Sequence, residues 1–408
     1  MTAAVPPSRP RPSATVLVVR RAAAGCEVLL LRRADKGDHN SNAWVFPGGL
    51  VDATDRNAHG CCTGLDDAAA SRRLGVAEGG LDYYVAAIRE TFEEAGLLLA
   101  VDAQGRLPTA QSPGFERLMA LRGPVACGEV DFATLCREHG LRLAADRLHY
   151  VAHWVTPAGM PKRFDTRFFL AALPPLQEAG HDAVELLEHG WFAPAQLLAS
   201  PAGRKLMYAT RSMLEQLARF ETVDALLAWA AAEPPVKMVL RRRAVDRSGA
   251  QVLDPDHPAW PEVGLLDAGG AGTAWCELHP GLDVPVTPSV LRLTHSGGNS
   301  YLLGDAQSGW VVIDAAAGEA ERARLLSATG GQEPTSVTTG SPTPVTQLRF
   351  GSTTLVPAPS PAGTAWLLPR ERLLFTGEWI PAPGELPDWV RQAAAWAAPR
   401  RGFLIPLA

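Results

Sequence analysis

The sequence predicts a mixed α/β protein of two domains, in which a larger α/β domain is followed by a smaller β-rich one. The chain has 408 residues, and at roughly 100–200 residues per domain this is more than one fold usually needs. Hydrophobic residues make up 47% of it and charged residues 20%, a globular balance that excludes disordered and fibrous chains. Strand-like and helix-like runs alternate up to residue 232, whereas strand-like runs dominate after residue 286. The two domains should therefore differ in class.

Residues 14–232 carry the predicted α/β domain. Apolar runs between turn-forming residues indicate strands, the first two of which should form a hairpin; they cover residues 14–20, 27–33, 97–101, 149–156, 166–173 and 185–192. Residues 81–97 follow the helical period instead, and Gly96 is a typical helix C-cap. Further helices are expected after Pro194 and over residues 205–220 and 223–232, which are rich in Ala and Leu and close the domain.

The remaining chain is predicted to form a tail, a linker and a second domain. Residues 1–13 are rich in proline and lack a hydrophobic signal core, so we expect a disordered tail. The composition of residues 233–285 shifts towards Pro, Gly and Asp, which favours a connecting region. Residues 286–408 form the β-rich domain, with a helix over residues 318–327 and strands at residues 290–294, 300–304, 309–314, 347–356, 364–369 and 373–376.

Charge and composition exclude several kinds of partner. The net charge is −5 and the pI is near 6.1, so no overall positive field exists to hold nucleic acid. No run of 18 or more apolar residues occurs, so we expect no membrane span and a cytoplasmic location. The six cysteines form no C-x-x-C pair, which favours reduced thiols. The β-rich domain should bury its apolar faces against the helices of residues 205–232 or against a second copy, so a homodimer is left open.

Three carboxylates share one face of the helix predicted over residues 81–97. At about 100° per residue, Glu90, Glu93 and Glu94 fall within one arc of about 100°. Like charges at this spacing destabilise a helix by a few tenths of a kcal/mol per pair, so the arrangement needs a compensating cation. Mg²⁺ or Mn²⁺ is expected, because hard dications prefer carboxylate and carbonyl oxygens. The alternative is an ordinary amphipathic surface helix that carries three acids.

A Gly-Gly turn upstream gives these acids a context. Gly48 and Gly49 have no side chains, which lets main-chain oxygen approach a metal or a phosphate. Together, the turn and the helix resemble the Nudix box, the motif of the Nudix hydrolases. Its positions are taken by Gly49, Asp55, Arg89, Glu90, Glu93, Glu94, Gly96 and Leu97.

Three features depart from the family pattern. The first acid is Asp55 rather than Glu, Thr91 replaces an aliphatic residue, and residues 56–88 form a spacer far longer than usual. We expect residues 56–80 to loop out as an exposed and partly mobile insertion, because their Gly, Ala, Asp and Arg content offers little to bury. A long insertion in the box is similar to the Nudix subgroup that includes peroxisomal coenzyme A diphosphatases, and residues 154–157, 162–169 and 181–194 support that subgroup.

The resemblance covers residues 14–220 and implies an α/β/α sandwich with a mixed sheet. It implies metal-dependent hydrolysis of a diphosphate linkage in a nucleoside-diphosphate derivative, such as coenzyme A or an acyl-coenzyme A. The residues agree with that chemistry, because acids alone would repel a diphosphate and can hold it only through bound dications.

The family pattern also implies roles for the residues of the box. Glu93 and Glu94 would be metal ligands, together with the main-chain carbonyl of Gly48. Glu90 would be a further ligand or the general base. Arg89 would orient one of the carboxylates by a charge-assisted hydrogen bond.

Candidates outside the box complete the predicted site. Glu185 is the candidate general base, with a solvated loop acid as the alternative. Arg163 and Arg167 flank Asp165, and strand alternation puts both arginines on one face, where they could bind substrate phosphates. For each arginine an ordinary salt bridge is an equally simple explanation.

The C-terminal domain resembles a degenerate metallo-β-lactamase-like fold. Residues 297–304 and 310–314 are similar to its opening strands, and residues 355–364 and 374–378 to two of its later segments. The last histidine of the chain is His295, so the histidine ligands of that fold are missing. We therefore expect a shortened, metal-free relative with a structural or partner-binding role; an unrelated small β-rich domain is the alternative.

Two other functions compete with a diphosphohydrolase. A catalytically disabled nucleotide-binding or scaffold protein would retain the fold, but it would be expected to lose some of the three helix carboxylates, all of which are present. An enzyme with its chemistry in the C-terminal half is disfavoured by the missing histidines. The sequence does not identify the group attached to the diphosphate.

Overall fold

The computed structural model describes residues 9–23, 25–35, 37, 41–180, 186–341, 347–382 and 384–407. The chain divides into two compact units. The first unit comprises Ser8–Thr156 and Pro161–Leu240, and the second comprises Pro157–Met160 and Arg241–Ala408.

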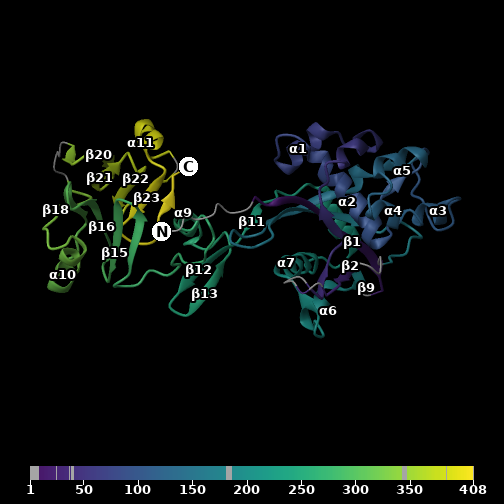
Figure 1. Ribbon diagram of the computed structural model, residues 1–408, viewed down its shortest axis with the longest axis horizontal. Coiled ribbons are helices and arrows are strands. Elements are labelled where there is room, and N and C mark those ends of the chain that lie inside the picture. Colours follow the sequence, from purple (N-terminus) through teal and green to yellow (C-terminus); the bar gives the residue numbers. More distant parts are fainter. Residues whose placement is uncertain are drawn as a thin grey trace. The chain divides into compact units, whose positions relative to one another are not determined.

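A mixed sheet forms the centre of the first unit (Figure 1). Its strand order is β10-β3-β2-β1-β8-β7-β11, with β4 paired to β1 and β9 paired to β2. The pairing of β1 with β8 is parallel, and that of β8 with β7 is antiparallel. The strands are β1 (Arg11–Ala22), β2 (Gly25–Arg33), β3 (Ala43–Val45), β4 (Gly48–Leu50), β7 (His149–Val155), β8 (Phe164–Ala172), β9 (Leu186–Phe192), β10 (Lys205–Leu206) and β11 (Met238–Leu240).

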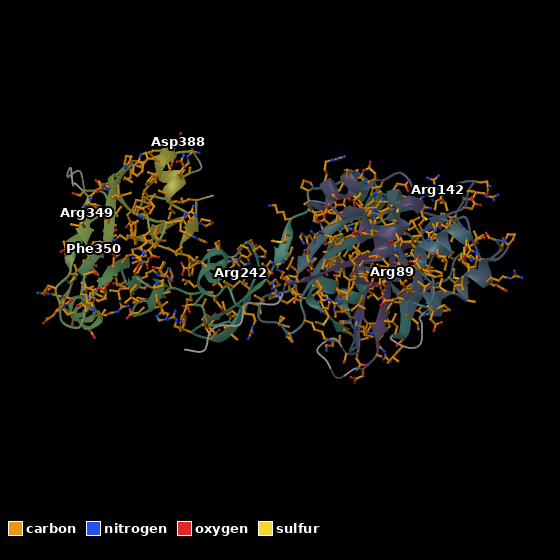
Figure 2. All side chains as sticks on the ribbon, turned by 45° about the horizontal axis from the view of Figure 1, so that its top comes forward. Arg89, Arg142, Arg242, Arg349, Phe350 and Asp388 are labelled. Carbon is orange, nitrogen blue, oxygen red and sulfur yellow. The ribbon has the colours of Figure 1, made fainter. Side chains whose placement is uncertain are left out.

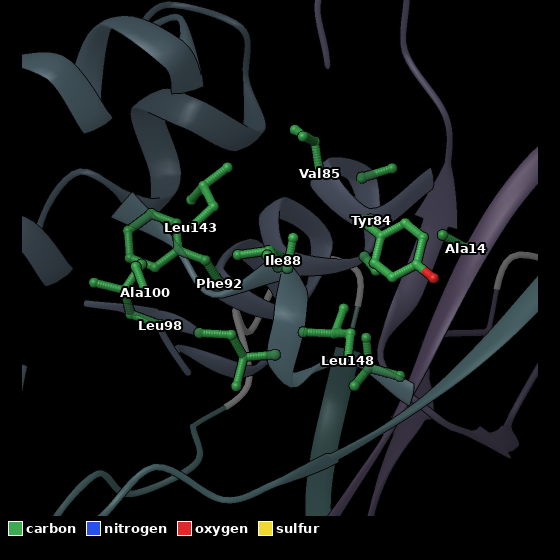
Figure 3. Close-up of a cluster of buried hydrophobic side chains, with 14 of the residues drawn as sticks. Ala14, Tyr84, Val85, Ile88, Phe92, Leu98, Ala100, Leu143 and Leu148 are labelled. Atoms are coloured by element: carbon green, nitrogen blue, oxygen red, sulfur yellow. The ribbon is translucent and has the colours of Figure 1, made fainter. Parts of the chain in front are cut away.

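Helices cover both faces of this sheet, so the unit is the expected α/β/α sandwich. Alternate residues of β1 contribute to two separate cores, with Val16 and Val18 on one face and Leu17 and Val19 on the other. The first face packs against α1 (Asp67–Leu74), α2 (Gly80–Ala95) and α5 (Phe132–Glu138), as Figure 3 shows for part of α2. The second packs against α6 (Pro194–Ala199), α7 (Tyr208–Leu217) and α8 (Val223–Ala231).

Short elements fill the segment between α2 and β7. They are β5 (Ala100–Val101), α3 (Phe115–Met119), α4 (Arg122–Ala126), β6 (Arg142–Leu143) and η2 (Ala145–Arg147). The strand predicted over residues 97–101 is therefore confined to its last two residues, which pair with β6.

The insertion does not loop out as predicted. Its residues form η1 (Asp55–Cys61) and α1, and Ala58, Ala70 and Leu74 are buried in the core beneath α2. The reason is visible in the sequence: small and aliphatic residues lie one helical turn apart, so α1 has an apolar face to bury. Asp66 caps the helix by accepting a hydrogen bond of 2.7 Å from the amide of Ala69.

Two further predictions for this unit were wrong in detail. The tail predicted over residues 1–13 is partly structured, because β1 begins at Arg11 and pairs there with Phe164 of β8; residues 1–8 lie outside the described residues. The helix predicted from residue 205 starts at Tyr208, because Lys205 and Leu206 pair with β3 as β10.

The second unit contains two sheets that share one core. The first sheet has the order β14-β15-β16-β17-β18 and the second the order β19-β20-β21-β22-β23-β24. Tyr301 and Ile313 from the first sheet meet Trp366 and Phe375 from the second. Helix α10 (Glu319–Ala328) packs on the outer face of the first sheet, and α11 (Asp388–Ala393) on that of the second. The result is four layers, helix–sheet–sheet–helix.

These two sheets confirm a β-rich C-terminal region, but the strand predicted over residues 347–356 is divided into two, and the strands at residues 335–337, 396–399 and 405–406 were not predicted. The strands of the two sheets are β14 (Asp283–Thr287), β15 (Val290–His295), β16 (Gly298–Asp305), β17 (Gly309–Ile313), β18 (Thr335–Val337), β19 (Leu348–Phe350), β20 (Thr353–Ser360), β21 (Gly363–Leu368), β22 (Leu373–Gly377), β23 (Trp396–Pro399) and β24 (Ile405–Pro406). The metallo-β-lactamase-like resemblance stays a prediction.

The segment predicted as a linker, residues 233–285, is largely folded. It holds β11, the hairpin β12 (Arg242–Asp246) and β13 (Gly249–Leu253), helix α9 (Trp260–Leu266) and the start of β14. Ala244, Leu253 and Val263 form a small core of their own. Turn-forming residues dominate the composition of this segment, but these few apolar side chains are enough to fold it.

Candidate functional site

Helix α2 carries the three predicted carboxylates and is fixed by its buried face. Tyr84, Ile88 and Phe92 lie one turn apart in the core, as labelled in Figure 3, and this leaves the opposite face partly open. The helix ends at Gly96, whose φ of 64° is left-handed, and the Gly96 amide donates to the carbonyl of Phe92 at 3.0 Å. Leu97 follows fully buried, as the box pattern implies.

Arg89, whose position is labelled in Figure 2, contacts several acids on the polar face of α2. Its Nε and Nη2 atoms donate to the two carboxylate oxygens of Asp55 at 2.8 and 3.1 Å, a bidentate pair in which the Asp55 side chain is only 1% exposed. Its Nη1 donates to Glu90 at 2.9 Å and to Glu93 at 3.3 Å, and Nη2 also reaches the carbonyl of Leu50 at 2.9 Å. The predicted orienting role of Arg89 thus has a matching geometry.

The Gly-Gly turn lies directly against two of the carboxylates. The main-chain amide of Gly48 donates to Glu94 at 2.8 Å. A Cβ atom on Gly49 would lie 2.4 Å from the carboxyl group of Glu90, so only glycine leaves room for that side chain. The site therefore brings together two segments that are far apart in the chain, since Gly48 and Glu94 are separated by 46 positions.

Burial and neighbouring charges shift the pKa values of several groups in this cluster. Burial raises the pKa of Asp55 even though Arg89 opposes the shift. Burial also raises the pKa of Glu93 to about 7, with Arg89 opposing and Glu90 adding to the shift. Although burial favours its neutral form, Arg89 has its pKa raised by Asp55 and Glu90. A single guanidinium is thus shared by three acids.

The donor set suits a hard dication. Glu90, Glu93 and Glu94 offer carboxylate oxygens within about one turn of α2, and oxygen ligands of this kind are the ones that Mg²⁺ and Mn²⁺ prefer. In the conformation described, these oxygens are engaged by Arg89 and by the Gly48 amide. Among the residues that the structure describes, no three His, Cys, Asp or Glu side chains are gathered tightly enough to hold a metal ion.

Of the two predicted phosphate-binding arginines, Arg167 lies on β8 opposite Ala14 of β1, and Ala14 pairs on its other side with Gly49. Arg167 is 4% exposed, is hydrogen-bonded to Asp165 and lies 2.6 Å from His153. Although burial opposes it, the hydrogen bond from His153 and the charge of Arg167 hold the pKa of Asp165 below its ordinary value. Arg163 donates to the carbonyl of Thr156 at 3.1 Å. This geometry favours the salt-bridge alternative for Arg167.

Glu185, the candidate base, lies outside the described residues. A residue that the sequence reasoning missed is Arg122, whose guanidinium donates to the carbonyls of Phe92 and Glu93 at the end of α2, both at 3.0 Å. No local pattern marks it, because it comes from α4, well beyond the box. The nearest signal is Gly96, where a Cβ would lie 2.7 Å from Arg122.

Comparisons with known proteins find similarity to Nudix proteins, as the resemblance of this chain to the Nudix box predicts. The family described as NUDT19 Nudix domain matches residues 76–219. Human acyl-coenzyme A diphosphatase NUDT19 is 30% identical over 55% of this chain and 66% of its own length. The protein of the same name from Xenopus laevis is 27% identical over 49% and 62%. Putative nudix hydrolase 7 from Caenorhabditis elegans is 29% identical over 41% and 47%. The chain thus matches between 47% and 66% of the length of these curated relatives, which is less than two thirds of each.

Among solved structures, the chain is similar to a NUDIX hydrolase from Alicyclobacillus acidocaldarius. That likeness covers 54% of this chain and 96% of the other, with 26% identity and a TM-score of 0.45.

No helix in the described part of the chain combines the length and the hydropathy needed to cross a bilayer.

Proposed function

Because this chain contains a Nudix domain of the NUDT19 type, we propose that it is a metal-dependent diphosphohydrolase whose substrate is coenzyme A or an acyl-coenzyme A. The observation that carries the proposal is the contact between the α2 carboxylates and the Gly48–Gly49 turn. The names of the human and frog relatives supply the substrate class.

The residues of the site would have different roles, which follow from their positions and contacts. Glu93 and Glu94, with the carbonyl of Gly48, would hold Mg²⁺ or Mn²⁺, and Glu90 would be a further ligand or accept the proton of the attacking water. When bound, the cation supplies positive charge against the diphosphate and acidifies a coordinated water. Arg89 keeps Glu90 and Glu93 in place, and its pairing with Asp55 prevents it from turning towards solvent.

The reaction consumes one water and releases two phosphomonoesters. The water oxygen bonds to one phosphorus, the bond from that phosphorus to the bridging oxygen breaks, and the water proton passes to a carboxylate. Glu185 remains a second candidate for that base, and Arg163 remains a candidate for binding substrate phosphates.

The test is hydrolysis by the full chain. The protein is incubated with Mg²⁺ or Mn²⁺ and a panel of coenzyme A esters, dinucleotides and nucleotide sugars in ¹⁸O-labelled water. Cleavage of coenzyme A or its esters, with label in only one of the two phosphomonoesters, is expected. No cleavage of any diphosphate would contradict the proposal and favour a nucleotide-binding or scaffold protein.

Paired variants show whether the carboxylates act. Glu93→Gln and Glu94→Gln should each abolish turnover and leave the fold intact, since they remove a charge from a partly open face. Glu116→Gln, on the exposed face of α3, is the matched control and should retain wild-type rates. Near-wild-type turnover by both α2 variants would overturn the metal-ligand assignment. A cytoplasmic location and a homodimer stay predictions.

A further inference from the structure

The last turn of α2 is held from outside the Nudix box. The last four carbonyl groups of a helix have no partner within it. Here the Phe92 carbonyl accepts from the Gly96 amide at 3.0 Å and from Arg122 Nε at 3.0 Å, and the Glu93 carbonyl accepts from Arg122 Nη2 at 3.0 Å. The Ala95 carbonyl accepts from the Gly180 amide at 2.9 Å.

The same guanidinium joins this helix end to a second segment. Arg122 Nη2 also donates to the carbonyl of Gly180 at 2.9 Å. Gly180 lies on the segment that returns from β8, and the buried Gln177 fixes that segment by donating to the carbonyls of Leu98 and Pro108 at 3.2 and 2.7 Å. Arg122 thus lies between two backbone segments that are each anchored elsewhere.

The local sequence is adapted to this contact. A Cβ on Gly96 would lie 2.7 Å from Arg122 Nη1, so glycine at the helix cap provides both the left-handed φ and the space for the guanidinium. A positive charge at a helix C-terminus also interacts favourably with the helix dipole. A planar group with several fixed donors suits three carbonyls better than an ammonium group does.

We propose that Arg122 is a positioning residue for the carboxylates of the proposed diphosphohydrolase site. Glu93 and Glu94 lie on the turn that Arg122 holds, and Glu94 must meet the Gly48 amide across the site. A displacement of about 1 Å at a catalytic centre costs on the order of 100-fold in rate. The inference rests on the proposed function, and it adds a residue that donates hydrogen bonds to the main chain of the helix.

The test compares Arg122→Ala, Arg122→Lys and Arg142→Ala in the full chain. Arg142 is an exposed arginine of β6, labelled in Figure 2, and serves as the matched control. We expect Arg122→Ala to lower kcat about 10- to 100-fold with KM changed less than about threefold. Arg122→Lys should fall between Arg122→Ala and wild type, and added guanidinium should restore part of the activity of Arg122→Ala. Arg142→Ala should match wild type.

Folding is controlled for separately. Circular dichroism and urea unfolding give the folded fraction, and kcat is expressed per folded molecule. An unchanged kcat per folded molecule in both Arg122 variants would overturn the inference. If Arg122→Ala does not fold, Arg122→Lys decides alone: a lowered kcat supports the inference and a wild-type kcat overturns it.

A metal titration separates this inference from the proposed function. Mn²⁺ binding, followed by electron paramagnetic resonance, should weaken several-fold in the Arg122 variants and stay unchanged in Arg142→Ala. If the wild-type chain cleaves no diphosphate, the proposed function fails, and weaker Mn²⁺ binding still supports the positioning role. Equal Mn²⁺ affinity in all four proteins would contradict it.

Discussion

Replacement by alanine should have different consequences at Gly48 and at Gly49, two neighbouring residues of β4. A Cβ at Gly48 would lie 2.4 Å from the carbonyl oxygen of Ala14 and 2.6 Å from the Cα of Thr15, and the φ of Gly48 is +153°. A Cβ at Gly49 would instead meet the carboxyl group of Glu90 at 2.4 Å, the far end of a flexible side chain. Gly48→Ala should therefore damage the fold, and Gly49→Ala should damage the site.

The expected magnitudes follow from these contacts. Gly48→Ala adds backbone strain of about 1–3 kcal/mol and overpacking of about 1–3 kcal/mol, so its free energy of unfolding should fall by about 2–6 kcal/mol. In Gly49→Ala, Glu90 must rotate away from Arg89, an ion pair worth roughly 1 kcal/mol or less. Alanine offsets this by about 0.4–1 kcal/mol through the unfolded state. Its stability should therefore stay within about 1 kcal/mol of wild type.

Urea unfolding and steady-state kinetics measure the two effects. Gly49→Ala should lose about 100-fold or more in kcat, because it displaces a carboxylate that serves as ligand or base. Gly60→Ala is the control, since nothing lies within 4 Å of its added Cβ. Full activity in Gly49→Ala, or wild-type stability in Gly48→Ala, would refute the described contact between β4, β1 and α2.

Three further outcomes are expected. Asp55→Asn should lose about 3 kcal/mol of unfolding free energy in urea, because a buried ion-pair partner of Arg89 disappears; a loss below about 1 kcal/mol would contradict this. Burial and, less strongly, the charge of Arg73 lower the pKa of His149, so its neutral form stabilises the fold above a pH of about 6.5 and that stability is lost as the pH falls. Thermal unfolding from pH 7 to 5 should show a smaller decrease in His149→Gln than in wild type. A fragment of residues 241–408 should be folded and should show a cooperative unfolding transition in urea, whereas a fragment of residues 286–408 should show no such transition.

The carboxylate helix was predictable because its signals are local. Glu90, Glu93 and Glu94 share one face by helical geometry alone, and Gly96 ends the helix through its left-handed φ. Their contact with Gly48 and Gly49 could be predicted only from the resemblance to a family pattern. The pairing of Arg89 with Asp55 specifically was not predictable, because several acids of the box lie within its reach.

Composition was a poor guide to the insertion. Its content of Gly, Asp and Arg suggested an exposed loop, yet the position of a few small residues decided the outcome. Gly80 approaches α1 so closely that a Cβ there would lie 2.2 Å from the amide of Ser71, whose hydroxyl accepts a hydrogen bond of 2.9 Å from the Gly80 amide. Arg72 and Arg73 of α1 are exposed, whereas Asp67 accepts hydrogen bonds from the amides of Gly79 and Leu81 on either side of this contact. The average composition of the segment does not show which of its residues face inward.

A buried ion pair ties α9 to the first sheet of the second unit. Arg292 of β15 donates through both terminal nitrogens to Glu262 of α9 at 2.7 and 2.8 Å, and both side chains are fully buried. The same carboxylate accepts from the amide of Leu404 at 2.6 Å. In the sequence each partner resembles an ordinary surface charge, and 30 residues separate them. Removing one partner leaves a buried, uncompensated charge that costs about 3–5 kcal/mol. The fold must therefore include α9, and because Ala244 and Leu253 pack with Val263 of α9, the unit begins near Arg241 rather than at residue 286.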